Sequence, residues 1–558
     1  MNHKENNLVS FFLDKGYLIS PDFIDKLDSK FNKEYFFDLI DKKILSKEKP
    51  IILNNDLKTV LNNGNSNLDI NWFEFENSKA LLEKGKDGKI YTTFLDILQS
   101  NISDDKKKLL KNILDDVKKP EEDIDLTNNK DDLVNPEDKK GTTIILDSYL
   151  EDPKKRDIKD FVSYFKVRYE SIKKLLMVRQ ELQNLVSINR LFNKNQIDTV
   201  SIIGLVSEKY TTKNGNILLK VEDITGFISV LVSKEKKEIF EESSNIVEDE
   251  IIGIVGVVRN KLFFANNIIW PDIPMKEFKK SSDEVYAAFI SDLHIGSKMF
   301  LSEDFKKFIK WIKGDLGNQK QKEICKKLKY LFIVGDLIDG CGIYPGQDKE
   351  LVLKDVYKQY ELCAEILSEV REDITIIICP GNHDALRIAE PQPALYKDFA
   401  KPLWDLPNVI MVSNPSLVNI HSSEDFLGFD VLLYHGYSFD YYVKNVNCIR
   451  ENGGYDRTDL LMKFLLQRRH LAPTHTSTLY IPTTKEDPLF IKKVPDFFVT
   501  AHVHKLSATN YKTVTMICCS CWQAKTTFQE KVGHEPDPSK VPLVNLKTRE
   551  VKILKFGS

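Results

Sequence analysis

Five apolar segments in the second half of the chain end abruptly in Asp, His or Asn: EVYAAFISDLHIG, KYLFIVGDLIDG, ITIIICPGNHD, FDVLLYHGYSF and PDFFVTAHVHK. Their ends carry Asp292 and His294, Asp336 and Asp339, Asn382 and His383, His435, and His502 and His504. Side chains two residues apart in an extended chain point to the same side and can bind one ion or two adjacent ions. One such motif alone is usually a satisfied turn. Five strand ends with the same class of ligand favour a metal centre.

The candidate ligands are carboxylates, imidazoles and one amide oxygen, without a thiolate. This mixture suits manganese, iron or zinc better than it suits a structural zinc finger. Even seven of these nine side chains are too many ligands for one tetrahedral ion, and seven fit two ions. A bridging carboxylate would hold such a pair about 3.5–4 Å apart, a spacing that suits displacement at phosphorus.

Residues 283–558 must position these side chains, and here apolar strands alternate with helical segments. This alternation predicts a layered α/β domain, in which the carboxyl ends of the strands form the ligand crevice. The cluster Cys518, Cys519 and Cys521 lies in the apolar run VTMICCSCW and has no second Cys/His pair at finger spacing. We therefore predict a buried strand there rather than a second metal site.

In residues 196–275 the apolar residues recur with a period of two, which predicts about five short strands joined by glycine-bearing turns. Five strands in this length predict a small barrel of the oligonucleotide-binding (OB) type. The barrel is either a nucleic-acid platform or a structural unit, and the sequence favours neither. Residues 151–195 are predicted as one long amphipathic helix, whose apolar stripe runs from Ile158 to Leu185.

Residues 1–75 repeat apolar pairs at helical spacing and predict a small helical module, either a docking unit or a packed cap. Residues 76–150 are assigned to a linker region. Its second half, KKPEEDIDLTNNKDDLVNPEDKK, is acidic and nearly free of aromatic residues. Such a composition buries too little apolar surface to offset the entropy of ordering, so we expect a flexible segment.

The whole chain of 558 residues has a formal net charge of -3, with 29% charged residues. This balance gives no global indication of nucleic-acid binding, so any basic surface must be local. No apolar run has the length of a membrane helix, and the start, MNHKENN, lacks the apolar segment of a signal peptide. We therefore expect a cytoplasmic protein without a membrane partner.

The ordered motifs D-x-H, G-D-x-x-D, G-N-H-D, H-G and A-H-x-H resemble the calcineurin-type metallophosphoesterase family over most of 285–510. The resemblance implies a four-layered αββα domain with two divalent cations. By position, Asp292, His294 and His504 would bind one metal, Asn382, His435 and His502 the other, and Asp336 would bridge them. His383 would be the catalytic acid, oriented by Asp339. Ala501 replaces a common glycine, and GDLIDG lacks the Arg of many phosphatases, which disfavours a protein phosphatase.

Further stretches, including VSIIGLVSEKYTTKNGNILLKVEDITG, NHDALRIAEPQPAL and WQAKTTFQEKVGHEPDP, resemble the small, exonuclease-bearing subunits of archaeal family D DNA polymerases. This resemblance spans about 155–558. It implies a 3′–5′ DNA exonuclease that removes nucleotides from the primer end, in a heterodimer with a large polymerising subunit. It also implies contact with single-stranded or mismatched DNA and association with the nucleoid, and the N-terminal module would meet other replication proteins.

Three arginines are candidate DNA contacts. Arg387 lies in the proline-containing loop RIAEPQP, directly after the proposed catalytic His383, where it could meet a phosphate; a surface salt bridge is the alternative. Arg468 and Arg469 form a basic cluster after an apolar helix, where a solvated helix end is the alternative. Two other functions stay open: a non-catalytic scaffold subunit, and a free metallophosphatase.

Overall fold

The computed structural model describes residues 17–19, 51–53, 142–150, 155–191, 199–483, 486–531 and 533–557. The chain divides into two compact units, residues 1–131 and residues 132–558. In the first unit the described residues are two short strands, β1 (Tyr17–Ile19) and β2 (Ile51–Leu53), paired in parallel. The helices expected within 1–75 lie outside the described residues.

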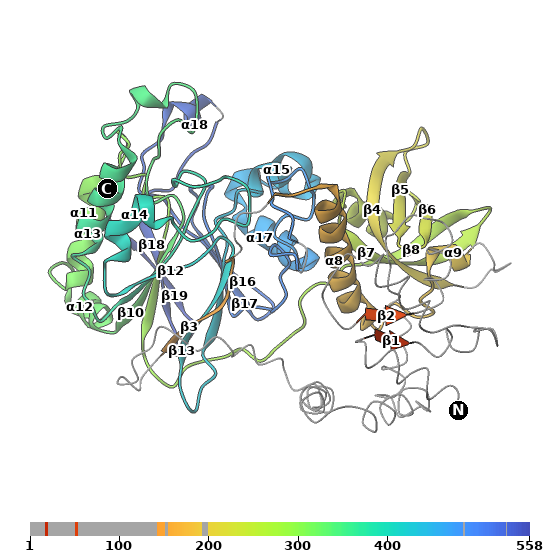
Figure 1. Cartoon of the computed structure of the whole chain (residues 1–558), viewed down its shortest axis with the longest axis horizontal. Helices are drawn as coiled ribbons and strands as arrows, with labels where there is room; N and C mark the ends of the chain where they lie inside the picture. Colours follow the sequence, from red (N-terminus) through yellow and green to blue (C-terminus); the bar gives the residue numbers. More distant parts are fainter. Residues whose placement is uncertain are drawn as a thin grey trace. The chain divides into compact units, whose positions relative to one another are not determined.

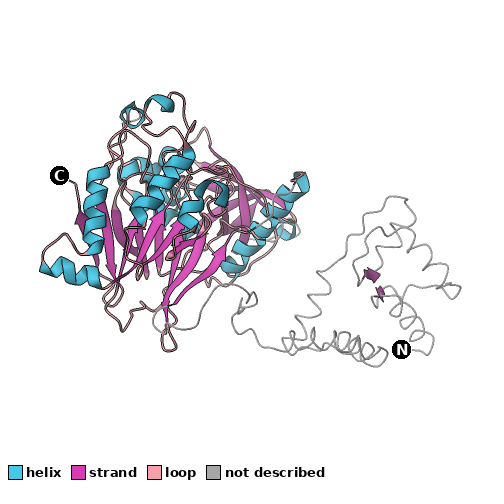
Figure 2. Cartoon of the chain, turned by 60° about the vertical axis from the view of Figure 1, so that its left-hand side comes forward, coloured by secondary structure: helices cyan, strands magenta, loops and turns pink. Residues whose placement is uncertain are grey.

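The second unit contains two six-stranded sheets (Figures 1 and 2). The first sheet has the order β12 (Val409–Met411), β11 (Thr375–Cys379), β10 (Leu328–Val334), β9 (Tyr286–Ile290), β18 (Lys540–Asn545) and β19 (Val551–Lys555). Its first four strands are parallel, and the last two are antiparallel to their neighbours. The parallel strands therefore direct their carboxyl ends to one edge of the sheet.

The second sheet has the order β16 (Ser507–Tyr511), β17 (Val514–Cys518), β15 (Phe497–Thr500), β14 (Phe429–Leu433), β13 (Ser416–Ser422) and β3 (Thr142–Ser148). Strands β14, β15 and β17 are parallel. Strand β17 lies in the apolar run around Cys518, where we predicted a buried strand, and all five of its residues are buried.

Strand β3 corrects the predicted boundary of the linker region. Residues 142–148, assigned to that region, pair antiparallel with β13 and form the edge of the second sheet. Hydrogen bonds at its end fix the chain further, because the Tyr149 amide donates to Oγ of Ser413 at 2.7 Å and the Ser413 amide donates to Oγ of Ser148 at 3.0 Å. The acidic composition upstream concealed this strand.

Alternation along the buried strands divides the core into layers. Phe289 and Phe332 face the second sheet, with ring centroids 4.9 Å apart, and belong to the apolar cluster that also contains Val431 and Phe497. Their neighbours on β9 and β10 point the opposite way, toward helices. Four helices cover the first sheet: α11 (Ser302–Lys313), α12 (Gln319–Lys326), α13 (Val356–Leu367) and α14 (Lys397–Trp404). Three cover the second: α15 (Phe439–Asn445), α16 (Asn447–Arg450) and α17 (Thr458–Arg468) (Figure 1).

A closed five-stranded barrel precedes these layers, as the period of two predicted. Its order is β4 (Val200–Thr211), β5 (Ile217–Asp223), β6 (Gly226–Val232), β8 (Leu262–Ile269) and β7 (Ile251–Arg259). Helix α10 (Lys237–Ser244) lies between β6 and β7 in sequence. The described part of the chain is therefore a mixed α/β structure with two large sheets and a barrel.

The long helix is shorter than predicted. Helix α8 (Ile158–Met177) begins at a capping box formed by Asp157 and Asp160. It does not continue to residue 195, because the following backbone pairs with the barrel: the Val186 amide donates to the Ser201 carbonyl at 2.9 Å. A second short helix, α9, then covers Ile188–Leu191.

Helix α8 is fixed to the segment between α17 and β15 by a buried polar group. Nε of Arg168 lies 2.7 Å from Oδ2 of Asp487, and the Tyr164 hydroxyl donates to Oδ1 of the same carboxylate at 2.7 Å. Among the helices of the described residues, none has the length and apolar character required to cross a membrane.

Candidate metal centre

The five predicted strand ends meet at one place. Loops after β9, β10 and β11 carry Asp292 to His383, and loops after β14 and β15 carry His435 to His504. Because these strands are parallel within each sheet, their carboxyl ends face the same edge. The structure gathers the ligand atoms of three overlapping groups within 4.8 Å each: Asp292, His294 and His504; His294, Asp336 and His383; and Asp336, His435 and His502.

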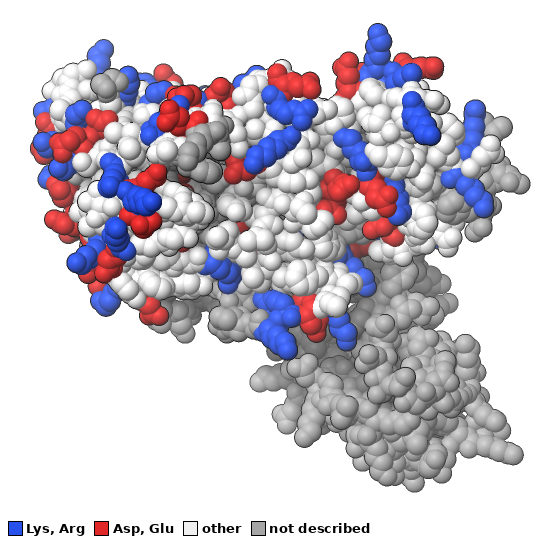
Figure 3. Space-filling view, turned by 90° about the horizontal axis from the view of Figure 1, so that it is seen from above, with Lys and Arg blue, Asp and Glu red and all other residues white. Residues whose placement is uncertain are grey.

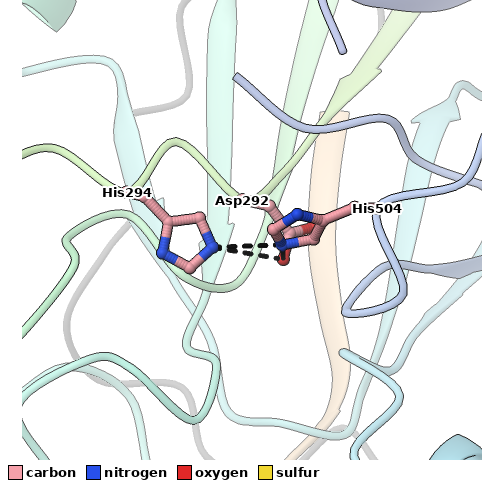
Figure 4. Close-up of side chains that lie close together, drawn as sticks. All are labelled: Asp292, His294 and His504. Carbon is pink, nitrogen blue, oxygen red and sulfur yellow. Dashed lines mark hydrogen bonds and ion pairs between the residues drawn. The ribbon is translucent and has the colours of Figure 1, made fainter. Parts of the chain in front are cut away.

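The first group contains two imidazoles that face each other beside a carboxylate (Figure 4). Nε2 of His294 lies 3.1 Å from Nε2 of His504, and the latter lies 3.2 Å from Oδ1 of Asp292. All three side chains are buried, and apart from its contact with His504, Oδ1 of Asp292 accepts no aligned hydrogen bond among the described residues. A buried carboxylate oxygen with so little compensation is costly unless a cation satisfies it, so this donor set fits a divalent metal.

The group of Asp336, His435 and His502, which we call the second group, is built around His435, whose side chain is fully buried. Its Nδ1 lies 2.9 Å from the Val334 carbonyl, so Nδ1 carries a proton and Nε2 is the ring nitrogen left for a metal. That Nε2 lies 3.3 Å from Oδ2 of Asp336 and 3.0 Å from Oδ1 of Asn382. Oδ2 of Asp336 also lies 3.8 Å from Nε2 of His294. Asp336 thus stands between the two groups, where a shared ligand must stand.

The backbone around these ligands is strained. A positive φ is uncommon for residues other than glycine, and such strain concentrates at functional sites. Five of the proposed ligands have a positive φ: Asp292 at 50°, His294 at 49°, Asp336 at 53°, His502 at 70° and His504 at 52°. The backbone of Gly381 also lies very close to the shared ligand. A Cβ at this position would lie 2.2 Å from Oδ1 of Asp336, so a larger residue does not fit.

The electrostatics keep the shared carboxylate ionised. Burial opposes the charge on Asp336, but the surrounding imidazoles of His435, His383 and His294 outweigh burial and hold its pKa well below the ordinary value. The imidazoles have this effect through their protonated, positively charged form, and bound cations would take over that positive charge while Asp336 stays ionised.

Comparison with known proteins identifies the family. A family model for the B subunits of DNA polymerases alpha and epsilon matches residues 287–508. The DNA polymerase II small subunit of Methanothermobacter thermautotrophicus is 41% identical over 401 residues, which cover 72% of this chain and 80% of that protein. The chain belongs to the archaeal DNA polymerase II (family D) small-subunit family.

Other members of the small-subunit family align over the same part of the chain. The proteins of Pyrococcus abyssi and Methanocaldococcus jannaschii are each 38% identical and cover 72% and 70% of this chain. The chain spans 63% and 64% of their lengths, less than two thirds. Among solved structures, the telomere capping protein Ten1 from Saccharomyces pombe aligns at 19% identity with 15% of this chain and 77% of its own, at a TM-score of 0.12, which supports no argument.

In this member of the small-subunit family, His383 adjoins both groups of ligands. Its amide donates to Oδ1 of Asp336 at 2.8 Å, and its ring centroid lies 4.6 Å from that of His294. Nδ1 of His383 lies 2.9 Å from an oxygen of Asp339, but this oxygen is the backbone carbonyl. The predicted contact between His383 and Asp339 is therefore made by the main chain of Asp339.

The Asp339 carboxylate contacts His294 instead. Oδ1 of Asp339 lies 3.2 Å from Nδ1 of His294 and accepts from Nε2 of Gln523 at 3.0 Å. Oδ2 accepts from Nε2 of Gln347 at 2.9 Å. Burial opposes ionisation, but the contacts with His294 lower the pKa of Asp339 from its ordinary value. A carboxylate on the far nitrogen of a metal-binding imidazole fixes its tautomer and orientation.

Sequence reasoning missed a similar partner of His502. Nε2 of His502 lies 3.3 Å from Oδ2 of Asp440 in α15, and the Tyr455 hydroxyl donates to Oδ1 of Asp440 at 2.5 Å. With Nε2 engaged in this way, Nδ1 is the ring nitrogen of His502 left for a metal. Asp440 belongs to no motif; the only available signal was its position five residues after His435.

Two of the three candidate DNA contacts are wrong. Arg468 and Arg469 are only 5% and 3% exposed. Arg468 pairs with buried Glu250 of the barrel region, with Nε and Oε2 2.5 Å apart. Arg469 donates from Nε to the Ile491 carbonyl at 2.9 Å. Both arginines therefore hold chain segments together, and neither forms a solvated helix end.

Arg387 lies beside the metal centre but is engaged locally. Its NH2 donates to the Pro391 carbonyl at 2.7 Å, and its guanidinium lies 5.1 Å from the centroid of the Tyr149 ring.

In Figure 3, acidic and basic side chains of the described residues are interspersed over the face shown, without a continuous basic tract.

Proposed function

We propose that this protein is the proofreading 3′–5′ DNA exonuclease of a family D DNA polymerase. It would hydrolyse the phosphodiester bond at the primer end with two divalent cations, preferably manganese, with iron or zinc as alternatives. One observation carries the proposal: Asp336 lies between His294 of one ligand group and His435 of the other, and His383 contacts Asp336 and His294 there. Relatives named DNA polymerase II small subunit support the assignment to a polymerase.

The chain's own residues divide the work. Asp292, His294 and His504 would hold one cation. Asn382, His435 and His502 would hold the other, and Asp336 would be shared. When bound, the cations supply Lewis-acid stabilisation of the phosphate charge and activation of a water molecule. Asn382 contributes a neutral oxygen, which limits the negative charge where an anionic phosphate must bind.

His383 would protonate the leaving 3′ oxygen. Its Nδ1 is engaged by the Asp339 carbonyl at 2.9 Å, so Nε2 is the nitrogen that can face a substrate. A backbone carbonyl holds the ring without adding a charge, and a proton placed on the leaving group contributes about 10²–10⁴-fold to such reactions. The contact therefore orients an acid where the bond breaks.

The rest of the chain would serve assembly. The barrel order β4-β5-β6-β8-β7, with β6 parallel to β8, is the basis for proposing an OB-type barrel. The two sheets and their helices would form the αββα phosphoesterase domain. A small polymerase subunit implies a large catalytic subunit as partner, for which the barrel and α8 would be a scaffold. The module at 1–75 would dock other replication proteins.

Two alternatives predict different behaviour. A scaffold without catalysis would not need all seven ligand positions, yet each carries a metal-binding side chain. A free phosphatase acting on nucleotides or proteins would not account for the barrel or for the similarity to polymerase subunits.

The test is exonuclease polarity with manganese on a 5′-labelled primer with a mismatched 3′ end, using the chain alone and with its large subunit. The wild type should shorten the primer from its 3′ end, and Asp336→Asn and His435→Ala should not. Asp373→Asn removes an exposed carboxylate paired with Arg371 and is the matched control. Equal shortening by Asp336→Asn, His435→Ala and wild type would refute the two-metal assignment.

A further inference from the structure

A pair of buried amide side chains adjoins the second group of ligands. Gln392 follows the metal-centre loop after β11, and Asn414 precedes β13; they are 2% and 0% exposed. Their backbones pair in both directions, with Gln392 N to Asn414 O at 2.7 Å and Asn414 N to Gln392 O at 2.9 Å. We refer to Gln392 and Asn414 together as the amide clasp.

The side chains of the amide clasp are fully engaged. Nδ2 of Asn414 donates to Oε1 of Gln392 at 2.7 Å. Nε2 of Gln392 donates to the carbonyls of Gly381 at 3.1 Å and Arg387 at 3.0 Å. Oδ1 of Asn414 accepts the His435 amide at 2.9 Å, and because that amide can only donate, the orientation of the Asn414 side chain is fixed.

These bonds end on the backbone of two proposed ligands of one cation. Gly381 directly precedes Asn382, and the Asn414 contact is to His435 itself. Asn382 comes from the first sheet and His435 from the second, so no shared strand fixes their separation. The amide clasp spans that gap, and Oδ1 of Asn382 lies 3.0 Å from Nε2 of His435.

We propose that Gln392 and Asn414 are positioning residues that hold Asn382 and His435 at the separation needed to bind one divalent cation. Hydrogen bonds beyond the ligands themselves orient metal ligands and raise affinity. The proposal rests on the cation site of the proposed function. The alternative is that two buried amides only stabilise the fold, as any satisfied polar pair does.

Titration of the full chain with Mn²⁺, followed by electron paramagnetic resonance, separates these roles without requiring nuclease activity. Gln392→Met keeps the volume but removes both polar groups, and Asn414→Leu removes the contact to His435. Each should weaken binding of one of two Mn²⁺ ions by about 10–100-fold. Mn²⁺ binding by the double variant should be about as weak as binding by the worse single variant, because the two residues act as one unit.

Asn419→Leu is the matched control. Asn419 is a 5% exposed amide on β13 that donates to the carbonyl of Leu427 at 3.0 Å, so its loss should lower Tm and leave both Mn²⁺ affinities unchanged. If Gln392→Met or Asn414→Leu does not fold, Gln392→Glu keeps the oxygen that accepts from Asn414 but loses the donors to Gly381 and Arg387. Gln392→Glu should weaken the binding of the same Mn²⁺ ion.

The outcomes are distinct. The positioning role would be overturned if variants of the amide clasp have a lowered Tm, as the control does, but bind both Mn²⁺ ions with wild-type affinity. A wild type that binds two Mn²⁺ ions and degrades no DNA would refute only the exonuclease. A wild type that binds no Mn²⁺ would overturn both proposals.

Discussion

Asp339 and His294 are joined by a direct contact in which Oδ1 of the carboxylate lies 3.2 Å from Nδ1 of the imidazole. Asp339 therefore acts on a proposed metal ligand through its side chain and on His383 through its main chain. A substitution that changes only the side chain can separate the two relationships.

Asp339→Asn should weaken metal binding by about 10–100-fold, because the amide no longer fixes His294 as a charged partner does. The shape of the side chain and the carbonyl contact to His383 would remain. The measurement is Mn²⁺ titration followed by nuclease assay at saturating Mn²⁺, where activity should largely return. Unchanged Mn²⁺ affinity with a persistent loss of turnover would mean that the carboxylate serves His383 after all.

His383→Ala should show the reverse behaviour. Both Mn²⁺ ions should bind as in wild type, while kcat falls by about 10²–10⁴-fold through loss of the proton donor. His475→Ala is the control, because that imidazole lies outside the ligand groups and contacts Asp249. If His383→Ala binds one Mn²⁺ ion fewer than wild type, His383 is itself a metal ligand. The geometry permits this outcome, because His383 lies in one group with His294 and Asp336.

Breaking the ion pair between Arg168 and Asp487 should be strongly destabilising, because both side chains are almost fully buried. Asp487→Asn or Arg168→Leu leaves a buried charge without its partner and should lower the free energy of unfolding by about 3–5 kcal/mol. The exposed pair Lys401 and Asp405 gives the comparison, and Lys401→Met should cost less than about 1 kcal/mol. Thermal unfolding followed by circular dichroism measures the difference, and equal losses would contradict the prediction.

Stability should fall on acidification through His470. Burial lowers the pKa of His470 from 6.5 to about 4, and nearby Arg168 adds to this shift. The Ala472 amide donates to Nδ1, so the neutral ring offers its Nε2 proton to Asp487. Between about pH 6.5 and pH 4 the unfolded chain binds a proton that the folded chain excludes, so folding is favoured above this window and loses stability within it.

His470→Gln should remove this contribution. Denaturant unfolding at several pH values should give a smaller loss of stability between pH 6.5 and pH 4 for the variant than for wild type. Identical pH slopes would show that His470 does not titrate in this window.

Much of the metal centre could be predicted from sequence because the chemistry lies at strand ends. An apolar strand that stops at Asp292 or His435 shows both the element and the side chain that it presents. The alternation that placed Phe289 and Phe332 in the core between the sheets is likewise local. That these residues bind metal stays a prediction.

Contacts between distant segments could not be predicted. Arg468 has the appearance of a basic helix end, and only its approach to Glu250, far away in sequence, explains its burial. Asp440 has no motif around it, and its contact with His502 depends on how α15 packs. The carboxylate of Asp339 could have faced either histidine, since the spacing of G-D-x-x-D does not distinguish His294 from His383.

Strand β3 has a practical consequence for anyone shortening this polypeptide. Truncation at residue 150, the end of the region that composition marks as a linker, would remove β3 and leave the outer backbone groups of β13 unpaired. Newly exposed strands of this kind recruit other chains and promote aggregation. An N-terminal deletion meant to preserve the two six-stranded sheets should therefore end upstream of Thr142.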